Sequence, residues 1–174
     1  ADRWYDPVLA GRASLGRTDP DLDPLGYRTL FALALGEGYY DEPRLRERLL
    51  SRDQVYPETA LMGRFETGVV DAAVVYRSMA ASRGYAYVDL PAALDLSDPG
   101  RAGEYAAASY ALADGETVRG APIAYGAVAR NDRETVRKLF EHLVTDREYL
   151  VREGFTVPGT LPTYRGEVPG GFRA

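Results

Sequence analysis

The chain has 174 residues, a formal net charge of −5, no cysteine and a single histidine. With 45% hydrophobic residues it can form a real core, as one domain or as two small lobes. Its basic residues are scattered, which argues against a nucleic-acid partner, and the lack of cysteine excludes disulfides, thiol catalysis and thiolate metal sites. No apolar run is long enough to span a membrane, and the opening ADRWYDPVLAG lacks the basic and apolar parts of an export signal, so we expect no such signal within this chain.

The first half of the chain alternates between strand-like and helix-like segments. In chain order, the pattern predicts a strand over Arg12–Arg17, helices over Leu25–Tyr40 and Pro43–Leu50, a helix from Glu58 to Gly68, a buried strand over Asp71–Tyr76, a short helix over Arg77–Arg83 that ends at Gly84, and a strand over Tyr85–Pro91. Strands at this spacing with helical connections are typical of an α/β protein with a mostly parallel sheet and crossover helices. We expect residues 13–16, 72–76 and 87–90 to share that sheet.

The second half has a different pattern. It predicts two strands joined at Asp114-Gly115, which is a strong hairpin signal, and a third strand over Ile123–Ala129. A helix capped by Asn131 or Asp132 and a further helix that ends at Gly154 follow. Beyond Phe155 the chain is rich in proline and glycine, which predicts a segment that runs over the surface.

Three carboxylates, Asp19, Asp21 and Asp23, stand directly before the helix that begins near Leu25. The free N–H groups and the dipole of a helix start attract anions, so this loop could bind one. Three carboxylates would then be unexpected, because they would repel the bound anion. One explanation is structural: Asp23 caps the helix ahead of Pro24, and Asp19 forms a turn. The other explanation is an anion whose central atom accepts carboxylate oxygens.

Three segments taken together resemble the tungstate/molybdate-binding proteins of ABC importers: "GRTDPDLDPLGYRTL", "PETALMGRFETGVVDAAVVYRSMAASRGYAYVDLP" and "DGETVRGAPIAYGAVAR". The D-P-x-G-Y-R and V-Y-R-S elements are the most specific. The resemblance runs from around Trp4 to around Pro158 and matches only the second half of such proteins. It implies a type II periplasmic-binding-protein fold, with oxyanion-binding lobe 2 in residues 1–113 and, in residues 114–174, return segments that belong to lobe 1.

The resemblance also implies a ligand set. In that family two protein carboxylates expand the coordination of the oxyanion metal to six, and oxygen is the donor that a hard, highly charged metal prefers. The matching residues here are Asp23 and Glu58 as ligands to tungsten or molybdenum, and Tyr76 as a hydroxyl donor to the oxyanion. We expect Glu66, a further carboxylate in the Glu58 helix, and His142 to be surface residues.

The implied function is transport without catalysis: the protein carries tungstate or molybdate to an ABC transporter permease in the membrane, and it needs no cofactor besides this ligand. The expected location is extracytoplasmic, either periplasmic or anchored at the cell surface. Two alternatives remain. The first is a binding lobe for sulfate or phosphate, in which N–H and hydroxyl donors alone contact the anion. The second is a hydrolase that uses Asp23 and Glu58 as a carboxylate pair, although the lone Trp4 lies far from both in sequence.

Overall fold

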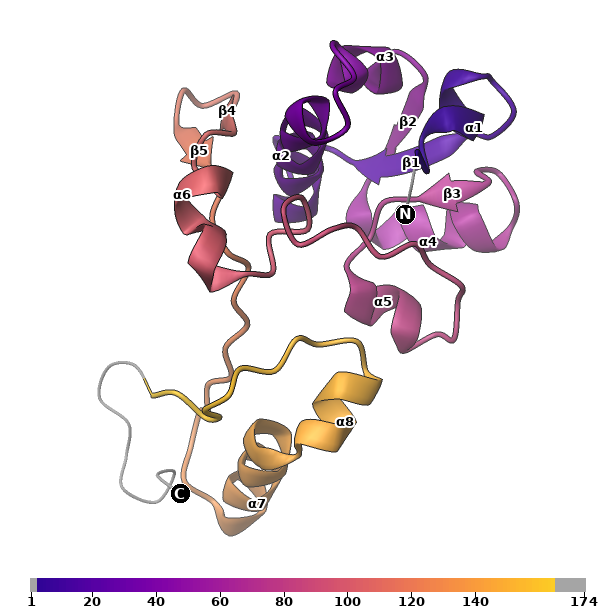
Figure 1. The fold of residues 1–174 in the computed structure, drawn as a ribbon. Helices are drawn as coiled ribbons and strands as arrows, with labels where there is room; N and C mark the ends of the chain where they lie inside the picture. Colours follow the sequence, from indigo (N-terminus) through magenta and orange to yellow (C-terminus); the bar gives the residue numbers. More distant parts are fainter. Residues whose placement is uncertain (1–2, 165–174) are drawn as a thin grey trace. The chain divides into compact units, whose positions relative to one another are not determined.

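The computed structural model describes residues 3–164, which form two compact units (Figure 1). Unit 1 comprises residues 3–76 and 87–123, and unit 2 comprises residues 77–86 and 124–164. The predicted boundary between residues 113 and 114 falls inside unit 1. The assignment of the segments to two lobes of a binding protein therefore stays a prediction. None of the helices in residues 3–164 is both long and apolar enough to cross a membrane.

The centre of unit 1 is a three-stranded parallel sheet in the order β2-β1-β3. The strands are β1 (Leu15–Thr18), β2 (Asp53–Tyr56) and β3 (Ala72–Ala73). All four residues of β1 are buried, because this strand is paired on both edges. The predicted α/β class with a parallel sheet is confirmed. Strand β2 was not predicted, and β3 is shorter than the predicted strand over residues 71–76.

Helices connect these strands, as predicted: α2 (Pro24–Tyr39) and α3 (Leu45–Leu50) between β1 and β2, and α4 (Glu58–Glu66) between β2 and β3. Helix α1 (Asp6–Leu9) precedes β1 and was not predicted. Helix α2 begins with proline at its first position. Proline suits this position because the first N–H of a helix would have no partner within the helix, and proline has no N–H. Helix α4 is followed by Gly68, whose φ of +72° ends the helical run.

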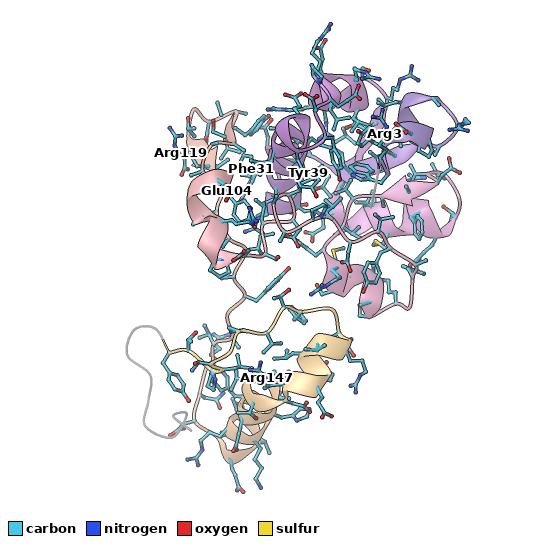
Figure 2. The ribbon with its side chains drawn as sticks, in the orientation of Figure 1. Arg3, Phe31, Tyr39, Glu104, Arg119 and Arg147 are labelled. Atoms are coloured by element: carbon cyan, nitrogen blue, oxygen red, sulfur yellow. The ribbon has the colours of Figure 1, made fainter. Side chains whose placement is uncertain are left out.

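Helix α2 packs on two sides, which explains its broad apolar surface. Leu33 belongs to a cluster under α1, α3 and β1, whose other buried members are Tyr5, Val8, Leu15, Leu45 and Leu49. Phe31 lies two residues earlier, so it points to the opposite side of the helix, where it packs with Leu96, Tyr105 and Ala108. Figure 2 labels Phe31 on α2 and Glu104 on the facing helix α6. Helix α2 is therefore the shared core element of unit 1.

The rest of unit 1 contains η1 (Pro99–Arg101), α6 (Ala102–Tyr105) and an antiparallel hairpin of β4 (Ser109–Ala111) and β5 (Thr117–Arg119). The hairpin predicted at Asp114-Gly115 is confirmed, and Gly115 takes the positive φ of +91° that its turn requires. Tyr110 and Val118 pair across the hairpin and pack against the Phe31 side of α2.

Unit 2 contains α5 (Arg77–Ala81), α7 (Glu134–Thr145) and α8 (Arg147–Arg152). These helices were predicted, but the cap of α7 was not: Arg133 is the N-cap, and Asn131 instead accepts a hydrogen bond from the Arg133 N–H (3.2 Å) in the preceding turn. No residue of α7 is buried, and Leu139 on its apolar face is 59% exposed. The predicted surface segment has no regular structure up to residue 164, and its remainder lies outside the described residues.

Two predicted strands are wrong. Residues 87–90 and 123–129 have no strand structure, and several of their apolar side chains are exposed, with Val88 at 57% and Val128 at 95%. A β-strand needs a neighbouring strand to take up its backbone hydrogen bonds. Ile123 donates one such bond, to the Leu96 carbonyl (2.8 Å), and no ladder follows.

A buried ion pair joins the central strand to β2. Arg17 on β1 donates to Asp53 on β2, and the two side chains are only 10% and 4% exposed. Arg17 also donates to the Thr18 carbonyl (3.0 Å), at the strand end that carries the candidate site. Burial raises the pKa of the Asp53 carboxyl, and the Arg17 guanidinium acts against this shift.

We predict that Arg17→Met lowers the free energy of unfolding at pH 7 by about 3–5 kcal/mol, because it leaves the Asp53 charge buried and unpaired. The pKa of Asp53 then rises further above its unfolded value. Above about pH 4 the folded variant therefore binds more protons than the unfolded chain, and its stability falls as the pH rises. Urea unfolding should show a smaller loss at acidic pH than at pH 7. Arg17→Met/Asp53→Asn should recover most of the loss at pH 7, and a loss that does not depend on pH would contradict this explanation.

The loop from Asp19 to Asp23 is pressed against the first turn of α2 at Gly26. A Cβ atom at Gly26 would lie 2.4 Å from the Asp19 carbonyl oxygen, which is closer than atoms can approach. That same oxygen accepts hydrogen bonds from the N–H groups of Leu22 (3.3 Å) and Asp23 (3.1 Å). The loop is held by its own backbone, and only glycine leaves room for it.

We therefore predict that Gly26→Ala costs about 1–3 kcal/mol of unfolding free energy, because the clash is with backbone that cannot move aside freely. Gly38→Ala is the matched control in the same helix. Gly38 is exposed, and a Cβ atom added there would meet no atom within 4 Å, so the same substitution should stabilise by about 0.5–1 kcal/mol. Equal effects of the two substitutions in denaturant unfolding would show that the loop does not depend on Gly26.

Candidate functional site

The three predicted site residues lie after three adjacent parallel strands, at one edge of the sheet. Asp23 follows β1, Glu58 follows β2 and Tyr76 follows β3. Because the strands are parallel and ordered β2-β1-β3, their carboxyl ends meet at the same edge (Figure 1). This edge is where ligands bind in open α/β sheets. The topology therefore places all three residues where a ligand site is expected.

The two carboxylate oxygens of Asp23 have different surroundings. Asp23 is the N-cap of α2, and its Oδ1 accepts a hydrogen bond from the Leu25 N–H (3.0 Å). Its Oδ2 is buried and has no hydrogen-bond partner among residues 3–164. A buried acceptor without a partner costs about 1–3 kcal/mol, and more when it is charged. The predicted cap is confirmed, but capping accounts for only one of the two oxygens.

The other two carboxylates of the loop are used in different ways. Asp19 accepts a hydrogen bond from the Asp21 N–H (2.9 Å), which forms a tight local turn. Asp21 accepts from the Tyr110 hydroxyl (3.1 Å) and from the Ala113 N–H (2.9 Å), so it ties the loop to the β4–β5 hairpin. Burial raises the pKa of Tyr110, and its hydrogen bond to Asp21 adds to this shift. Among the three, only Asp23 keeps a buried oxygen without a partner.

Thr18 is a further residue of interest that the sequence analysis missed. It ends β1, it is fully buried, and its hydroxyl has no hydrogen-bond partner within the described part of the chain. The segment from Thr18 to Asp23 therefore contains two buried polar oxygens that need a partner. The sequence pointed to Thr18 only as a hydroxyl residue near the end of a predicted strand, and such residues are too common to indicate a site.

Tyr76 is held by an arginine from α2. Arg28 donates through Nη1 to the Tyr76 hydroxyl (2.5 Å), and its guanidinium carbon lies 5.7 Å from the centre of the Tyr76 ring. Both residues are partly buried. This contact brings the Tyr76 side chain to the helix that Asp23 caps. Arg28 was not singled out from the sequence, although it is the arginine of the D-P-x-G-Y-R element.

Glu58 is less constrained. It is the first residue of α4, it is exposed, and it makes no hydrogen bond or ion pair with any residue in the range 3–164. Glu58 therefore lies at the same edge of the sheet as Asp23 and Tyr76, without a hydrogen bond to either of them. Glu66 is exposed at the opposite end of α4 and His142 is exposed on α7, as predicted. Residues 3–164 contain no group of three or more His, Cys, Asp or Glu side chains that could hold a metal ion.

Comparison with known proteins gives a consistent set of relatives. No protein-family model matches the chain. It is 56% identical over 170 residues to a protein of Haloferax volcanii named putative ABC transporter molybdenum-binding protein, and the match covers 97% of the chain and 56% of that protein. It is 36% identical to an uncharacterized solute-binding protein of Halobacterium salinarum, covering 95% of the chain and 55% of that protein.

A more distant match is the molybdate/tungstate-binding protein WtpA of Pyrococcus abyssi, which is 27% identical over 196 residues, with 97% of the chain and 57% of that protein covered. The chain thus spans little more than half the length of the curated relatives it matches. Identity of 56% over nearly the whole chain reflects common descent, and the relatives at each level of identity are named as binding proteins. By sequence, the chain is similar to ABC-transporter solute-binding proteins over most of its own length, and the matches cover part of each of those proteins.

Proposed function

We propose that this chain is part of a binding protein that captures tungstate or molybdate outside the cytoplasm and delivers it to an ABC transporter permease, without catalysing a reaction. The relatives named for molybdenum, molybdate or tungstate support the ligand class. The observation that carries the proposal is the buried Oδ2 of Asp23, a charged acceptor with no partner in residues 3–164 at the ligand-binding edge of the sheet.

A metal oxyanion suits this oxygen better than sulfate or phosphate does. Carboxylates repel any dianion by charge, so they stabilise one only if its central atom accepts them as ligands. A hexavalent metal can expand its coordination with hard oxygen donors, whereas sulfur and phosphorus in their tetrahedral oxyanions cannot. We assign Asp23 Oδ2 and Glu58 as the two added ligands and Tyr76 as a hydrogen-bond donor to an oxo group. In this assignment Asp23 caps α2 with one oxygen and binds the metal with the other.

We further propose a type II periplasmic-binding-protein fold, with residues 1–113 in one lobe and residues 114–174 as return segments of the other. The parallel sheet with crossover helices in unit 1 supports a lobe of this kind. The exposed apolar face of α7 is consistent with a segment that the rest of a longer protein would cover. We expect this chain to bind the oxyanion more weakly than a full-length relative does, because fewer hydrogen-bond donors surround the ligand.

We predict that Asp23→Asn abolishes the preference for tungstate but keeps the fold. Asparagine caps helices as well as aspartate does, so the free energy of unfolding should change by less than about 0.5 kcal/mol. Asp23→Ala should lose both the cap, at about 1 kcal/mol, and the preference. Calorimetric titration with tungstate, molybdate and sulfate at one ionic strength measures the preference, and urea unfolding measures the cap.

For Asp23→Asn, tungstate affinity should fall at least about tenfold, which corresponds to about 1.4 kcal/mol, while sulfate affinity should stay equal or rise because one negative charge is gone. Equal affinities of the unsubstituted chain for sulfate and tungstate would favour the alternative of a general anion lobe. Unchanged tungstate binding in Asp23→Asn would mean that Asp23 is only a helix cap.

We predict that Glu58→Gln lowers tungstate affinity and that Glu66→Gln does not. Glu66 is the matched control, because it is an exposed carboxylate at the far end of the same helix, about 12 Å along its axis. X-ray absorption at the tungsten edge should give six oxygen neighbours in the unsubstituted protein and in Glu66→Gln, and a lower number in Glu58→Gln. Four oxygens in the unsubstituted protein would exclude Glu58 and Asp23 as metal ligands.

A further inference from the structure

Arg28 differs from most other arginines of unit 1, although Arg64 likewise lies over a tyrosine ring, that of Tyr56. Most of them pair with a carboxylate: Arg3 with Asp6, Arg17 with Asp53, Arg44 with Glu47, Arg48 with Glu42, and Arg101 with Glu104. Arg28 is partly buried, yet it makes no ion pair with any carboxylate of residues 3–164. Its guanidinium instead contacts two tyrosines, Tyr76 through a hydrogen bond and the faces of Tyr27 and Tyr76 at 6.0 and 5.7 Å.

The hydrogen bond between Arg28 and Tyr76 has only one possible direction. A guanidinium has five N–H donors and no acceptor, so the Tyr76 oxygen must be the acceptor. The phenolic proton of Tyr76 is therefore directed away from Arg28. The position of the guanidinium carbon over the Tyr76 ring, 5.7 Å from its centre, adds a weaker second restraint. Together these contacts restrain the ring and limit the directions in which its hydroxyl can donate.

The position of Arg28 links this restraint to the candidate site. Arg28 lies five residues after Asp23 on α2, and the same helix start is fixed by the contact of the 19–23 loop with Gly26. Tyr76, in contrast, follows the two-residue strand β3, where the sheet ends early. Arg28 therefore couples a residue that follows a short strand to helix α2, seven of whose residues are buried. It also brings one positive charge to an edge of the sheet that carries Asp23 and Glu58.

We propose that Arg28 is a positioning residue for oxyanion binding: it orients the Tyr76 hydroxyl so that this group donates to the bound oxyanion. The inference rests on the proposed function, since it assigns Arg28 a role in the same site. It differs from a purely structural role in one respect. If Arg28 acts through Tyr76, the contribution of the Tyr76 hydroxyl to binding must depend on Arg28.

A double-mutant cycle tests this dependence in the full 174-residue chain. Tungstate and sulfate affinities are measured by calorimetric titration for the unsubstituted protein, Tyr76→Phe, Arg28→Gln and the double variant. We expect Tyr76→Phe to weaken tungstate binding about tenfold in the unsubstituted background and less than about twofold in the Arg28→Gln background. Arg28→Lys keeps the positive charge and can still donate to the Tyr76 oxygen, so Tyr76→Phe should regain part of its effect in this background. Arg28→Lys also replaces Arg28→Gln in the cycle if Arg28→Gln folds poorly.

Arg152→Gln is the matched control. Arg152 is on α8, and its guanidinium carbon lies 5.3 Å from the centre of the Tyr149 ring, so it also contacts a tyrosine. None of its contacts within the described residues involves Asp23 or Tyr76. The substitution should leave both affinities unchanged. If the unsubstituted chain binds tungstate and the two substitutions are additive, the positioning role is wrong while the proposed function stands. If the unsubstituted chain binds neither tungstate nor molybdate at millimolar concentration, the proposed function fails and this inference fails with it.

Discussion

The close contact between the 19–23 loop and the first turn of α2 is the constraint on which the candidate site depends. It is possible only because residue 26 is glycine, since a side chain there would overlap the Asp19 carbonyl. The contact fixes where α2 begins and therefore where Asp23 lies. Asp21 adds a second attachment, to Tyr110 and Ala113 of the hairpin. The loop is thus fixed by contacts within its own backbone, with α2 and with the β4–β5 hairpin, and none of these contacts needs a ligand.

The two oxygens of the Asp23 carboxylate have different surroundings, and the proposed function uses both. With Oδ1, Asp23 stabilises the start of α2 in the way that most N-cap residues do. Its Oδ2 is withdrawn from water without a partner, which is unfavourable for the isolated chain. An unfavourable buried oxygen at the ligand edge of a parallel sheet is a pattern that functional sites show more often than structural ones. In the proposed function, the cap supplies rigidity and the remaining oxygen is the one that binds the oxyanion.

The local signals in the sequence predicted the helices well. Pro24 after Asp23, Gly84 after α5 and Gly154 after α8 mark helix ends through backbone chemistry that does not depend on distant residues. Strands were predicted less well. Residues 87–90 and 123–129 have strand-like composition but no neighbour to pair with, whereas β2, with the polar sequence Asp53–Tyr56, pairs with β1 along its whole length. Pairing is a property of the folded chain, so alternation alone cannot decide it.

The sequence by itself determined the α/β class, most of the helices, the hairpin and, through the D-P-x-G-Y-R and V-Y-R-S elements, the resemblance that the relatives bear out. It could not separate the roles of Asp19, Asp21 and Asp23, since all three are aspartates in one loop. Only the tertiary structure assigned a turn to the first, a link to the hairpin to the second and a buried free oxygen to the third. Arg28 became part of the candidate site for the same reason. Its partner Tyr76 lies 48 positions away in the chain, and only the folded chain brings the two side chains together.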